Sequence, residues 1–432
     1  MLKIRRIKEL SREERDRILR RSRVDIESVL GDVRAIVADV RERKDMALLQ
    51  MLNGTSPIAG AEDIRVREEE FHEAEALVSK ELKEALGEAA QNIEAFHRAQ
   101  LEKPFWSVEI REGILLGRVT RPIERVGCYI PGGRAPYPST VLMTVIPAKV
   151  AGVREIYITT PCGEDLKVNP AILYAARMAG ATSVFKIGGP WGIAALAFGT
   201  ETIPKVDKIV GPGNKYVNAA KLLVFGEVDI DSPAGPSEGL ILADSSANPQ
   251  YLAWDLISQM EHDPEAAGIL ITTDETLAKE VQGLLMGLLP EIPKRDIILG
   301  AMGSYSLILI AEDIEEALDF VNEYAPEHLE IHGPNPFELL LRIKNAGSVF
   351  LGEYAPIPVG DYASGTNHVV PTGGAARAFS GLSVDSFLKR ITFQYLNRGG
   401  LRSIAHGVSE MSKAEGLLCH SEAVMVRLKD EG

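Results

Sequence analysis

Cysteine is scarce in this chain, and long apolar runs are absent. The 432 residues include three cysteines, Cys128, Cys162 and Cys419. They are odd in number and far apart, so they predict neither a disulfide framework nor a cysteine-rich metal site, and a reducing cytoplasm fits them. The most apolar stretch, residues 141–153, is interrupted by Pro147 and Lys149 and is too short to cross a bilayer. We therefore expect no transmembrane helix.

Positive charge is also in deficit. Lysine and arginine number 47 against 61 aspartate and glutamate, which leaves a net charge of -14. The electrostatic field of such a protein repels nucleic acid and anionic membranes, so we expect neither as a partner. Residues 1–23 carry charges of both signs and lack the apolar core of a secretion signal. They are expected to form an amphipathic helix.

The spacing of apolar residues divides the rest of the chain. Residues 26–104 have apolar positions three and four apart, which predicts helices. After residue 125, short β-branched runs alternate with glycine turns and helical segments, the pattern of a parallel α/β sheet. The first series has strands at VGCYI, EIYITT, SVFKI and DKIV, and helices starting near Asn169, Trp191 and Lys215. The second has strands at GLILAD, GILITT, SLILIA and SVFLG, and helices starting near Pro249, Glu275, Ile314 and Pro336.

These two series predict an α/β fold of two tandem Rossmann-like units with small helical N- and C-terminal segments. Each unit is expected to be an incomplete doubly wound, mostly parallel sheet. The predicted boundaries are an N-terminal helical arm at 1–25, one unit at 105–236, a second at 237–380 joined to the helical lead-in 26–104, and a helical tail at 381–432. The tail, with a helix over 383–396, is too small for its own core and is expected to dock elsewhere, against the N-terminal helix or a second subunit.

Two short motifs present side chains suited to chemistry. In LISQMEHD, Gln259 and His262 share one face of a helix, where an amide oxygen and an imidazole can bind a metal together. In NEYAPEHLEIHG, Glu327 and His328 are adjacent and can serve one pocket only if the backbone behind Pro326 is irregular. The carboxylate is expected to raise the pKa of the histidine and leave two proton-transfer groups near neutral pH. Capping or surface roles are the alternatives.

Two further segments lie nearer the C-terminus. The loop PVGDYASGTNHVVPTGG is too long for a plain turn and offers Asp361 as a carboxylate ligand, with three polar neighbours, Thr366, Asn367 and His368. In KAEGLLCHSEAV, Glu415 and His420 are five residues apart and cooperate only if Gly416 breaks the helix. Otherwise they are exposed groups of the tail.

The chain lacks a complete dinucleotide fingerprint. Glycine turns follow strands at 131–140, 188–192, 211–216 and 233–238, where backbone N–H groups can approach a phosphate. None completes G-x-G-x-x-G with a ribose-binding acid downstream, so the glycines alone identify no nucleotide.

In their order and spacing, the segments between Arg121 and His420 resemble histidinol dehydrogenase. The resemblance is carried by RVGCYIPGGRAPYPSTVLM, GPGNKYV, DSPAGPSE, SQMEHD, APEHLE, VGDYASGTNHVVPTGG, GLSVDSFLKR and AEGLLCH. It implies a cytoplasmic enzyme that oxidises L-histidinol through L-histidinal to L-histidine with two NAD⁺ and one water. These are the last two oxidations of histidine biosynthesis.

The resemblance also implies the roles of individual residues. One Zn²⁺ per subunit would be held by Gln259, His262, Asp361 and His420, the last from the other subunit of a homodimer on which the tail docks. Mn²⁺ or Co²⁺ would also suit this donor set. Ser237, Glu415 and His328 would complete the substrate pocket formed with the metal ligands. His328 would accept the alcohol proton, and Glu327 would activate water.

For the cofactor, the resemblance points to Tyr129 and Asn214, which makes 105–236 the cofactor-binding domain and 26–104 with 237–380 the substrate and metal domain. Many family members carry glutamine at the position of Trp191, where it is expected to contact NAD. Tryptophan can stack on a ligand but cannot reproduce the hydrogen bonds of an amide.

Two other functions stay open. One is an NAD-linked dehydrogenase of the same fold that acts on another small polyol, and the other is a non-catalytic metal-binding paralogue. Ser237, Glu415 and His420 argue against the first, because they are the groups expected to recognise the amine and imidazole of histidinol. Kinetics of Glu327→Gln and His328→Asn variants would separate the second.

Overall fold

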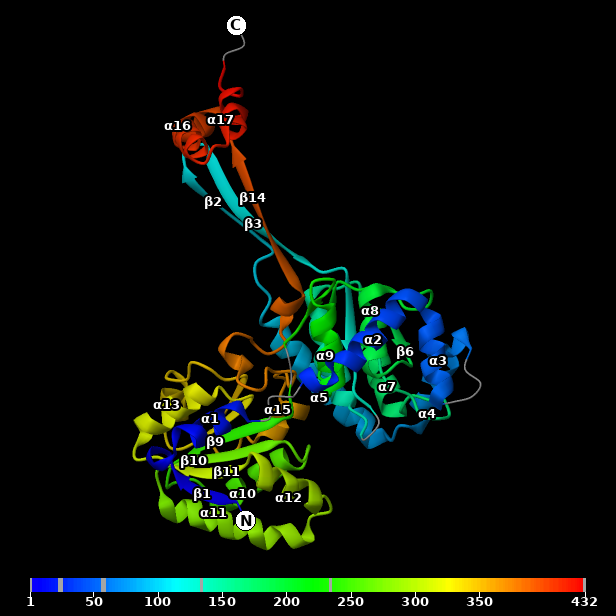
Figure 1. Cartoon of the computed structure of the whole chain (residues 1–432), viewed down its shortest axis with the longest axis vertical. Helices are drawn as coiled ribbons and strands as arrows, with labels where there is room; N and C mark the ends of the chain where they lie inside the picture. The colour runs from blue at the N-terminus through cyan, green and yellow to red at the C-terminus, as the bar shows by residue number, and fades with distance from the viewer. Residues whose placement is uncertain (1, 22–25, 56–59, 133–134, 233–234, 430–432) are drawn as a thin grey trace. The chain divides into compact units, whose positions relative to one another are not determined.

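The computed structural model describes residues 2–21, 26–55, 60–132, 135–232 and 235–429. The chain divides into two units, shown in Figure 1. Unit 1 comprises residues 1–100 and 124–387, and unit 2 comprises residues 101–123 and 388–432. Within the described residues, no helix is both long and apolar enough to span a membrane.

The first sheet of unit 1 has five parallel strands in the order β6-β5-β4-β7-β8. These strands are β4 (Arg125–Tyr129), β5 (Glu155–Thr159), β6 (Ser183–Phe185), β7 (Lys208–Val210) and β8 (Asp229–Ile230). The connecting helices are α6 (Pro138–Ala151), α7 (Pro170–Ala179), α8 (Gly189–Phe198) and α9 (Lys215–Val224). Counted along the chain, the order is 3-2-1-4-5, that of a Rossmann sheet without its sixth strand. The predicted strands and helices of the first series are therefore confirmed.

Helices cover both faces of this sheet. Gly127 of β4 lies against Leu196 of α8, whereas the neighbouring Cys128 is hydrogen-bonded to Thr144 of α6. Successive residues of a strand point to opposite faces, so α8 and α6 lie on opposite sides. The helices expected within residues 26–104 are present as α2 (Glu27–Arg43), α3 (Asp45–Thr55), α4 (Glu68–Leu77) and α5 (Lys80–Arg98). Of these, α2 and α3 share a core with α8 and α9.

The second sheet of unit 1 has six parallel strands in the order β1-β11-β10-β9-β12-β13. These strands are β1 (Lys3–Arg6), β9 (Glu238–Ala243), β10 (Ala267–Thr272), β11 (Leu307–Ile310), β12 (His328–His332) and β13 (Ser348–Leu351). Without β1 the order is again 3-2-1-4-5, so the two sheets share one topology. The second predicted series is confirmed as well.

Two hydrophobic cores lie on the two faces of this second sheet. One core contains α10 (Pro249–Met260), α11 (Glu275–Leu288) and α12 (Arg295–Ser304). The other contains α1 (Arg12–Arg20) and α13 (Ile314–Tyr324). Two short helices, α14 (Pro336–Leu340) and α15 (Ile357–Tyr362), follow β12 and β13. Burial on both faces explains why the central strands β9, β10 and β11 are almost continuously apolar.

The N-terminal prediction of one amphipathic helix is wrong for the first residues. Residues 3–6 form β1, which pairs with β11, and α1 begins only after a capping box between Ser11 and Glu14. Apolar Leu2 and Ile4 alternate with Lys3 and Arg5, a period-two pattern that suits an edge strand. Leu2 is fully buried in the core that contains α10 and α11.

Unit 2 is an antiparallel sheet in the order β14-β3-β2, followed by two helices. Its elements are β2 (Phe105–Arg111), β3 (Ile114–Pro122), β14 (Leu388–Leu396), α16 (Arg398–Ala414) and α17 (Leu418–Met425). The helix expected over 383–396 is wrong: residues 388–396 pair with β3 along their whole length. Residues 105–123, which were expected in the first α/β unit, contain β2 and β3 instead, and β3 pairs with this C-terminal strand. The partner is 266 to 282 residues away, so local periodicity could not reveal the strand.

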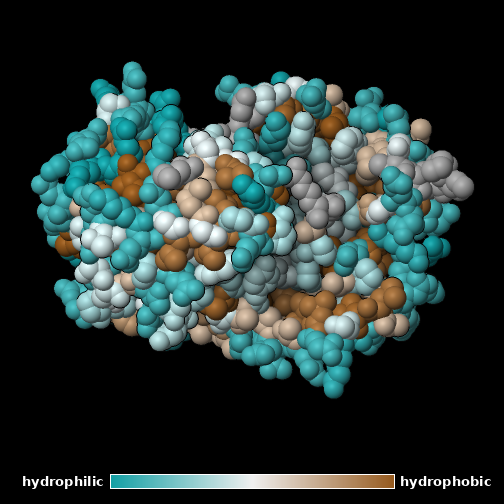
Figure 2. Space-filling view, turned by 90° about the horizontal axis from the view of Figure 1, so that it is seen from below, coloured by the Kyte–Doolittle hydropathy of each residue, from teal (hydrophilic) through white to brown (hydrophobic). Residues whose placement is uncertain are grey.

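Figure 2 shows the hydropathy of one face of the molecule. Hydrophilic side chains cover much of this face, with separate smaller apolar patches between them. That distribution agrees with a chain in which a quarter of the residues are charged.

Candidate functional site

A cavity of about 280 Å³ lies between the two parallel sheets of unit 1. From the first sheet it is lined by residues that follow β7 and β8, at the carboxyl edge. From the second sheet it is lined by residues that precede β9 and begin β12, at the amino edge. The two sheets therefore contribute opposite edges to one cavity.

The structure brings six of the predicted site residues to this cavity: Asn214, Ser237, His262, Glu327, His328 and Asp361. Gln259 and Tyr129 are buried and are not part of its lining. Glu415, at the end of α16, and His420, in α17, belong to unit 2, where both side chains are exposed. The cavity of unit 1 contains neither of them.

The first sheet presents its switch point, where β4 and β7 are neighbours and the chain order reverses. The turn after β7 needs glycine, because Gly211 has φ +118° and a Cβ there would collide with the Tyr129 carbonyl. A buried ion pair between Lys221 and Asp231 holds the turn. Lys221 Nζ donates to the Gly211 carbonyl at 3.0 Å, and Asp231 Oδ2 accepts from the Gly211 N–H at 2.7 Å. Asn214 Oδ1 then caps α9, whose N-terminus is suited to an anionic group.

Tyr129 ends β4 beside this turn. Its hydroxyl accepts a hydrogen bond from the Gly189 N–H at 3.1 Å, and burial raises its pKa. Trp191 is in the first turn of α8, where it is half-buried against the core formed with α2 and lies outside the cavity lining.

The second sheet presents Glu327 and His328. The helix α13 ends at Tyr324 and is capped by Ala325, a non-glycine residue with φ +51° directly before Pro326. The backbone is thus irregular where the sequence required it, and both side chains line the cavity. Glu327 and Glu238 are tied reciprocally: the Glu238 N–H donates to Glu327 Oε2 at 2.8 Å, and the Glu327 N–H donates to Glu238 Oε1 at 3.1 Å.

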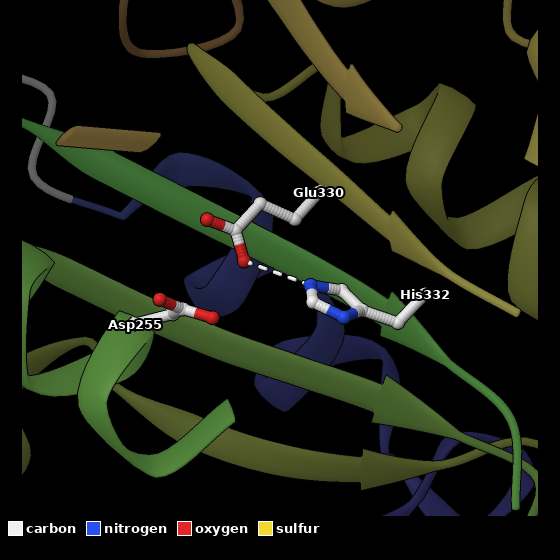
Figure 3. A group of neighbouring side chains, drawn as sticks. All are labelled: Asp255, Glu330 and His332. Atoms are coloured by element: carbon white, nitrogen blue, oxygen red, sulfur yellow. Dashed lines mark hydrogen bonds and ion pairs between the residues drawn. The ribbon is translucent and has the colours of Figure 1, made fainter. Parts of the chain in front are cut away.

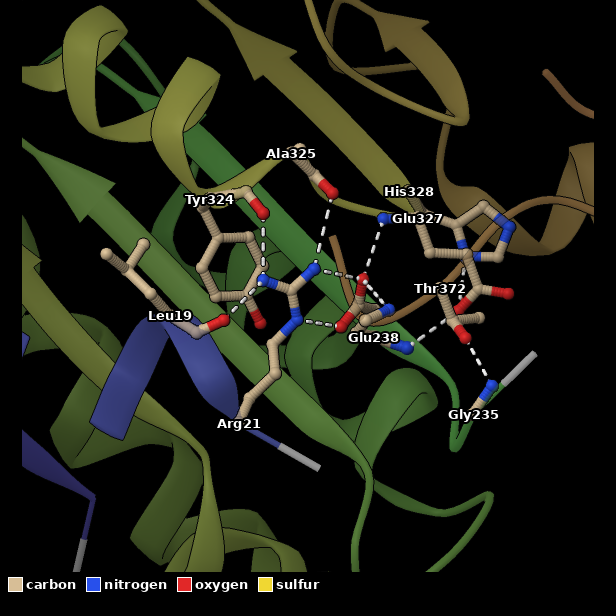
Figure 4. A network of polar contacts seen from close by, with 10 residues as sticks. Leu19, Arg21, Gly235, Glu238, Tyr324, Ala325, Glu327, His328 and Thr372 are labelled. Carbon is tan, nitrogen blue, oxygen red and sulfur yellow. Dashed lines mark hydrogen bonds and ion pairs between the residues drawn. The ribbon is translucent and has the colours of Figure 1, made fainter. Parts of the chain in front are cut away.

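A buried arginine from the N-terminal arm completes this network (Figure 4). Arg21 forms an ion pair with Glu238, and both side chains are almost fully buried. It also donates to the carbonyls of Tyr324 at 2.8 Å and Ala325 at 3.2 Å, and its guanidinium lies 3.6 Å from the centre of the Tyr324 ring. Sequence reasoning missed Arg21, because nothing local separates it from the arginines around it. Glu238 had one signal, a charge directly before an apolar strand.

The acid–base groups at the cavity have shifted pKa values. Burial, and then the charge of Glu238, raise the pKa of Glu327 well above its ordinary value. Burial, and then the charges of His368 and His262, lower the pKa of His328 to about 3. The expected rise in the histidine pKa is therefore wrong. The nearest carboxylates, Asp361 Oδ1 at 3.7 Å and Glu327 Oε2 at 3.9 Å, are too far to outweigh desolvation. His328 is a neutral proton acceptor at neutral pH.

The predicted metal ligands of unit 1 have mixed oxygen and nitrogen donors. Gln259 packs over Gly239, and its Oε1 is buried without a hydrogen-bond partner among the described residues. Burial lowers the pKa of His262 and raises that of Asp361 to about 7. An orphaned amide oxygen, a neutral imidazole and a carboxyl that a cation would ionise fit a divalent transition metal.

The loop after Asp361 has both structural and cavity-facing residues. His368 lines the cavity and contacts the Asp361 carbonyl at 2.9 Å and Thr140 Oγ1 at 3.1 Å. Asn367 donates to the Met143 carbonyl at 2.6 Å and fastens the loop to α6. Thr366 contacts Ser364 within the loop at 3.4 Å.

Another cluster was missed from the sequence. In the part of the chain that the structure describes, the one group of three His, Cys, Asp or Glu side chains close enough to share an ion is Asp255, Glu330 and His332. All three are buried, and none lines the cavity. The period-two spacing of His328, Glu330 and His332 along one strand was the signal that could have found two of them.

A Rossmann-type switch point with a glycine turn, facing a buried Glu-His pair across one cavity, is the arrangement that a nucleotide-dependent oxidoreductase requires. The sequence model of the histidinol dehydrogenase family matches residues 19–428. The histidinol dehydrogenase of Methanocaldococcus jannaschii is 52% identical over 427 residues, with 99% of each chain covered. That of Methanothermobacter thermautotrophicus is 50% identical, with 96% of each covered.

A solved structure agrees with these relatives. The crystal structure of histidinol dehydrogenase from Elizabethkingia anophelis superposes with a TM-score of 0.94 at 43% identity, covering 99% of this chain and 98% of that one. The chain therefore belongs to the histidinol dehydrogenase family. It is an enzyme, an NAD-dependent oxidoreductase that acts on CH–OH groups.

Proposed function

We propose that this protein oxidises L-histidinol through L-histidinal to L-histidine, the last steps of L-histidine biosynthesis, with two NAD⁺ and a bound Zn²⁺. The observation that carries the proposal is the adjacent pair Glu327 and His328, which reach one cavity with different protonation properties. Two successive oxidations need two proton acceptors at different positions. The irregular backbone at Ala325 allows two adjacent side chains, Glu327 and His328, to reach the same cavity.

His328 serves the first oxidation. Its imidazole is neutral because it is buried, and its Nδ1 has no hydrogen-bond partner among the described residues. It accepts the proton of the substrate hydroxyl as the hydride leaves the adjacent carbon. The bound NAD⁺ supplies the hydride acceptor in each oxidation.

Glu327 serves the second oxidation. Its carboxylate takes a proton from a water molecule, whose oxygen bonds to the aldehyde carbon, while the aldehyde oxygen takes the proton that His328 holds; the product is a hydrate. The hydrate then loses the second hydride to NAD⁺ and a hydroxyl proton to His328, and becomes the carboxylic acid. A raised pKa makes Glu327 a stronger base than an exposed carboxylate, and the two hydrogen bonds with Glu238 orient it.

Gln259, His262 and Asp361 would hold the metal together with His420 of the partner subunit. When bound, Zn²⁺ would hold the substrate through the imidazole and amino nitrogens of histidinol. The orphaned Oε1 of Gln259 and the raised pKa of Asp361 support this assignment, since a cation satisfies the first and ionises the second. Ser237 and Glu415 would complete the substrate pocket, and Tyr129 and Asn214 would contact NAD.

A homodimer is part of the proposal, because Glu415 and His420 are exposed on unit 2. Unit 2 also exposes many large apolar side chains: Phe105, Trp106, Val108, Ile110, Leu417, Leu418 and Met425. Apolar surface of this kind marks an interface. The three cysteines are free, which supports a cytoplasmic location.

The proposal is tested by measuring NADH formation from histidinol and from histidinal with Zn²⁺. We expect His328→Asn to slow histidinol oxidation by about 10²–10⁴-fold, and Glu327→Gln to slow histidinal oxidation by a similar factor. Glu280→Gln, which removes an exposed charge on α11, is the control and should match the wild type. Unchanged NAD reduction in both site variants would remove the assigned roles.

The alternatives give different results in the same assay. NADH formed with another polyol but not with histidinol would indicate a different dehydrogenase. Metal binding without NADH formation from any of these substrates would indicate a non-catalytic paralogue.

A further inference from the structure

One polar cluster of unit 1 has no part in the proposed chemistry, and it lies behind the cavity. His328, Glu330 and His332 alternate along β12 and share one face, while Leu329 and Ile331 pack in the core on the other. Glu330 is completely buried, and His332 is 3% exposed. Asp255 of α10 faces them, as Figure 3 shows. Burying three ionisable groups costs free energy unless they are paired, so their contacts call for an explanation.

Glu330 is the centre of these contacts. Its Oε1 accepts a hydrogen bond from the Ile357 N–H at 2.8 Å, and its Oε2 contacts His332 Nε2 at 3.2 Å. Asp255 forms a side-chain hydrogen bond with it. One carboxylate therefore joins three segments that are far apart in the sequence: α10, β12 and the start of α15.

Each of these segments carries a residue of the proposed site a short, regular distance away. Gln259 lies four residues after Asp255, one helical turn along α10. Asp361 lies four residues after Ile357 in α15. His328 lies two residues before Glu330 on the same face of β12. The contacts of the cluster are thus one helical turn from the proposed metal ligands Gln259 and Asp361, and one strand repeat from the proposed base His328.

A proton on Asp255 reduces the negative charge of this cluster. In the described residues, neither Asp255 nor Glu330 forms an ion pair with a lysine or arginine. Burial, and then the charge of Glu330, raise the pKa of Asp255 to about 8, so Asp255 is the donor and Glu330 the acceptor at neutral pH.

We propose that Glu330 is a positioning residue: with Asp255 and His332 it sets the register of α10, β12 and α15, and so holds Gln259, Asp361 and His328 in one geometry. This inference rests on the proposed function of those three residues. Hydrogen-bonding groups behind metal ligands commonly have this effect on metal affinity and activity.

The test compares Glu330→Gln with Asp255→Asn in the full-length protein. Glu330→Gln keeps the shape but replaces one of the two acceptor oxygens with an N–H₂ group, so the side chain can no longer accept from Ile357, His332 and Asp255 together, whereas Asn at 255 can still donate to Glu330. We expect Glu330→Gln to weaken Zn²⁺ affinity and lower kcat by about 10–100-fold each, and Asp255→Asn to have an effect of under about fivefold. Glu280→Gln controls for loss of one carboxylate.

Zn²⁺ is measured by chelator competition, independently of turnover, and each variant is checked by its melting temperature. Glu330→Gln that folds and binds Zn²⁺ like the wild type would overturn the inference. If Glu330→Gln fails to fold, it is combined with Asp255→Asn, which restores a match of hydrogen-bond donor and acceptor. The double variant should recover both folding and Zn²⁺ affinity, and a double variant that recovers neither would also overturn the inference. A second Zn²⁺ equivalent that Asp255→Asn abolishes would show that the cluster is itself a metal site. Failure of the proposed function is distinguishable, since His262→Asn would then leave Zn²⁺ affinity unchanged.

Discussion

The two parallel sheets of unit 1 have the same strand order, but they build the cavity in different ways. The first sheet uses its carboxyl edge, where backbone groups of a glycine turn and a helix N-terminus are presented at the switch point. The second uses its amino edge, where titratable side chains of β12, α10 and α15 converge. A shared topology therefore determines where backbone can approach a ligand, but it does not determine where acid–base chemistry is placed.

Each edge contains a buried ion pair next to the cavity, and removing the cation of that pair is the strongest way to break the comparison. Arg21→Met leaves Glu238 buried and unpaired in the second sheet, and Lys221→Met does the same to Asp231 in the first. Each variant should lose about 3–5 kcal/mol of unfolding free energy, measured in urea. Arg21→Met should also slow histidinal oxidation, because Glu238 orients Glu327. A loss below about 1 kcal/mol in either would show that its edge does not depend on the pair.

Two glycines sharpen the comparison, because each makes room for a site residue on one sheet. In Gly211→Ala the new Cβ collides with the Tyr129 carbonyl at φ +118°, so KM for NAD⁺ should rise about tenfold. In Gly239→Ala the Cβ lies 3.0 Å from Gln259 Cδ, so Zn²⁺ affinity should fall about tenfold. Gly283→Ala, with no atom within 4 Å of its Cβ, is the control. If Gly211→Ala changed the Zn²⁺ affinity and Gly239→Ala changed KM for NAD⁺, the assignment of the cofactor to the first sheet and the metal to the second would be contradicted.

Trp191 gives a smaller effect, confined to the first sheet. Trp191→Gln supplies an amide beside the cofactor edge, and one new hydrogen bond is worth about 0.5–1.5 kcal/mol. KM for NAD⁺ should therefore fall by about two- to tenfold, while KM for histidinol stays the same. An unchanged KM for NAD⁺ would place Trp191 outside cofactor binding.

The last comparison concerns the pH dependence of the stability of the second sheet. The pKa of Asp255 is about 8 in the folded protein and 3.8 in an ordinary carboxyl, so between these values the folded state holds a proton that the unfolded state has lost. The contribution of Asp255 to stability therefore falls as the pH rises from about 4 to 8. Asp255→Asn should flatten the dependence of melting temperature on pH across this window. Identical curves for variant and wild type would contradict the raised pKa.

Local patterns were sufficient for much of the fold. The β-branched runs and helix starts of both series were found where they were expected, because buried parallel strands and capped helices have strong local signals. The strands β1 and β14 were missed, since their pairing partners are hundreds of residues away. In both segments the spacing of the charged residues was that of a helix, which is why helices were predicted there.

The candidate site was predicted unevenly for a related reason. Glu327, His328, Asp361 and His262 stand in unusual polar segments, which made them visible. Arg21, Asp255 and Glu330 carry common charged side chains that look like surface residues until their burial is known. The direction of the His328 pKa shift was also predicted wrongly, because it depends on desolvation and on distances to carboxylates.

By itself, the sequence determined the α/β class, the positions of most strands and the kinds of side chain available for catalysis. These depend on residues near one another along the chain, whose periodicity and turn chemistry are local properties. The tertiary structure decided that one sheet contributes its carboxyl edge and the other its amino edge, and that a buried arginine and a buried carboxyl cluster stand behind the site. Burial and long-range contacts set these features, because the cost of an unpaired charge depends on everything packed around it.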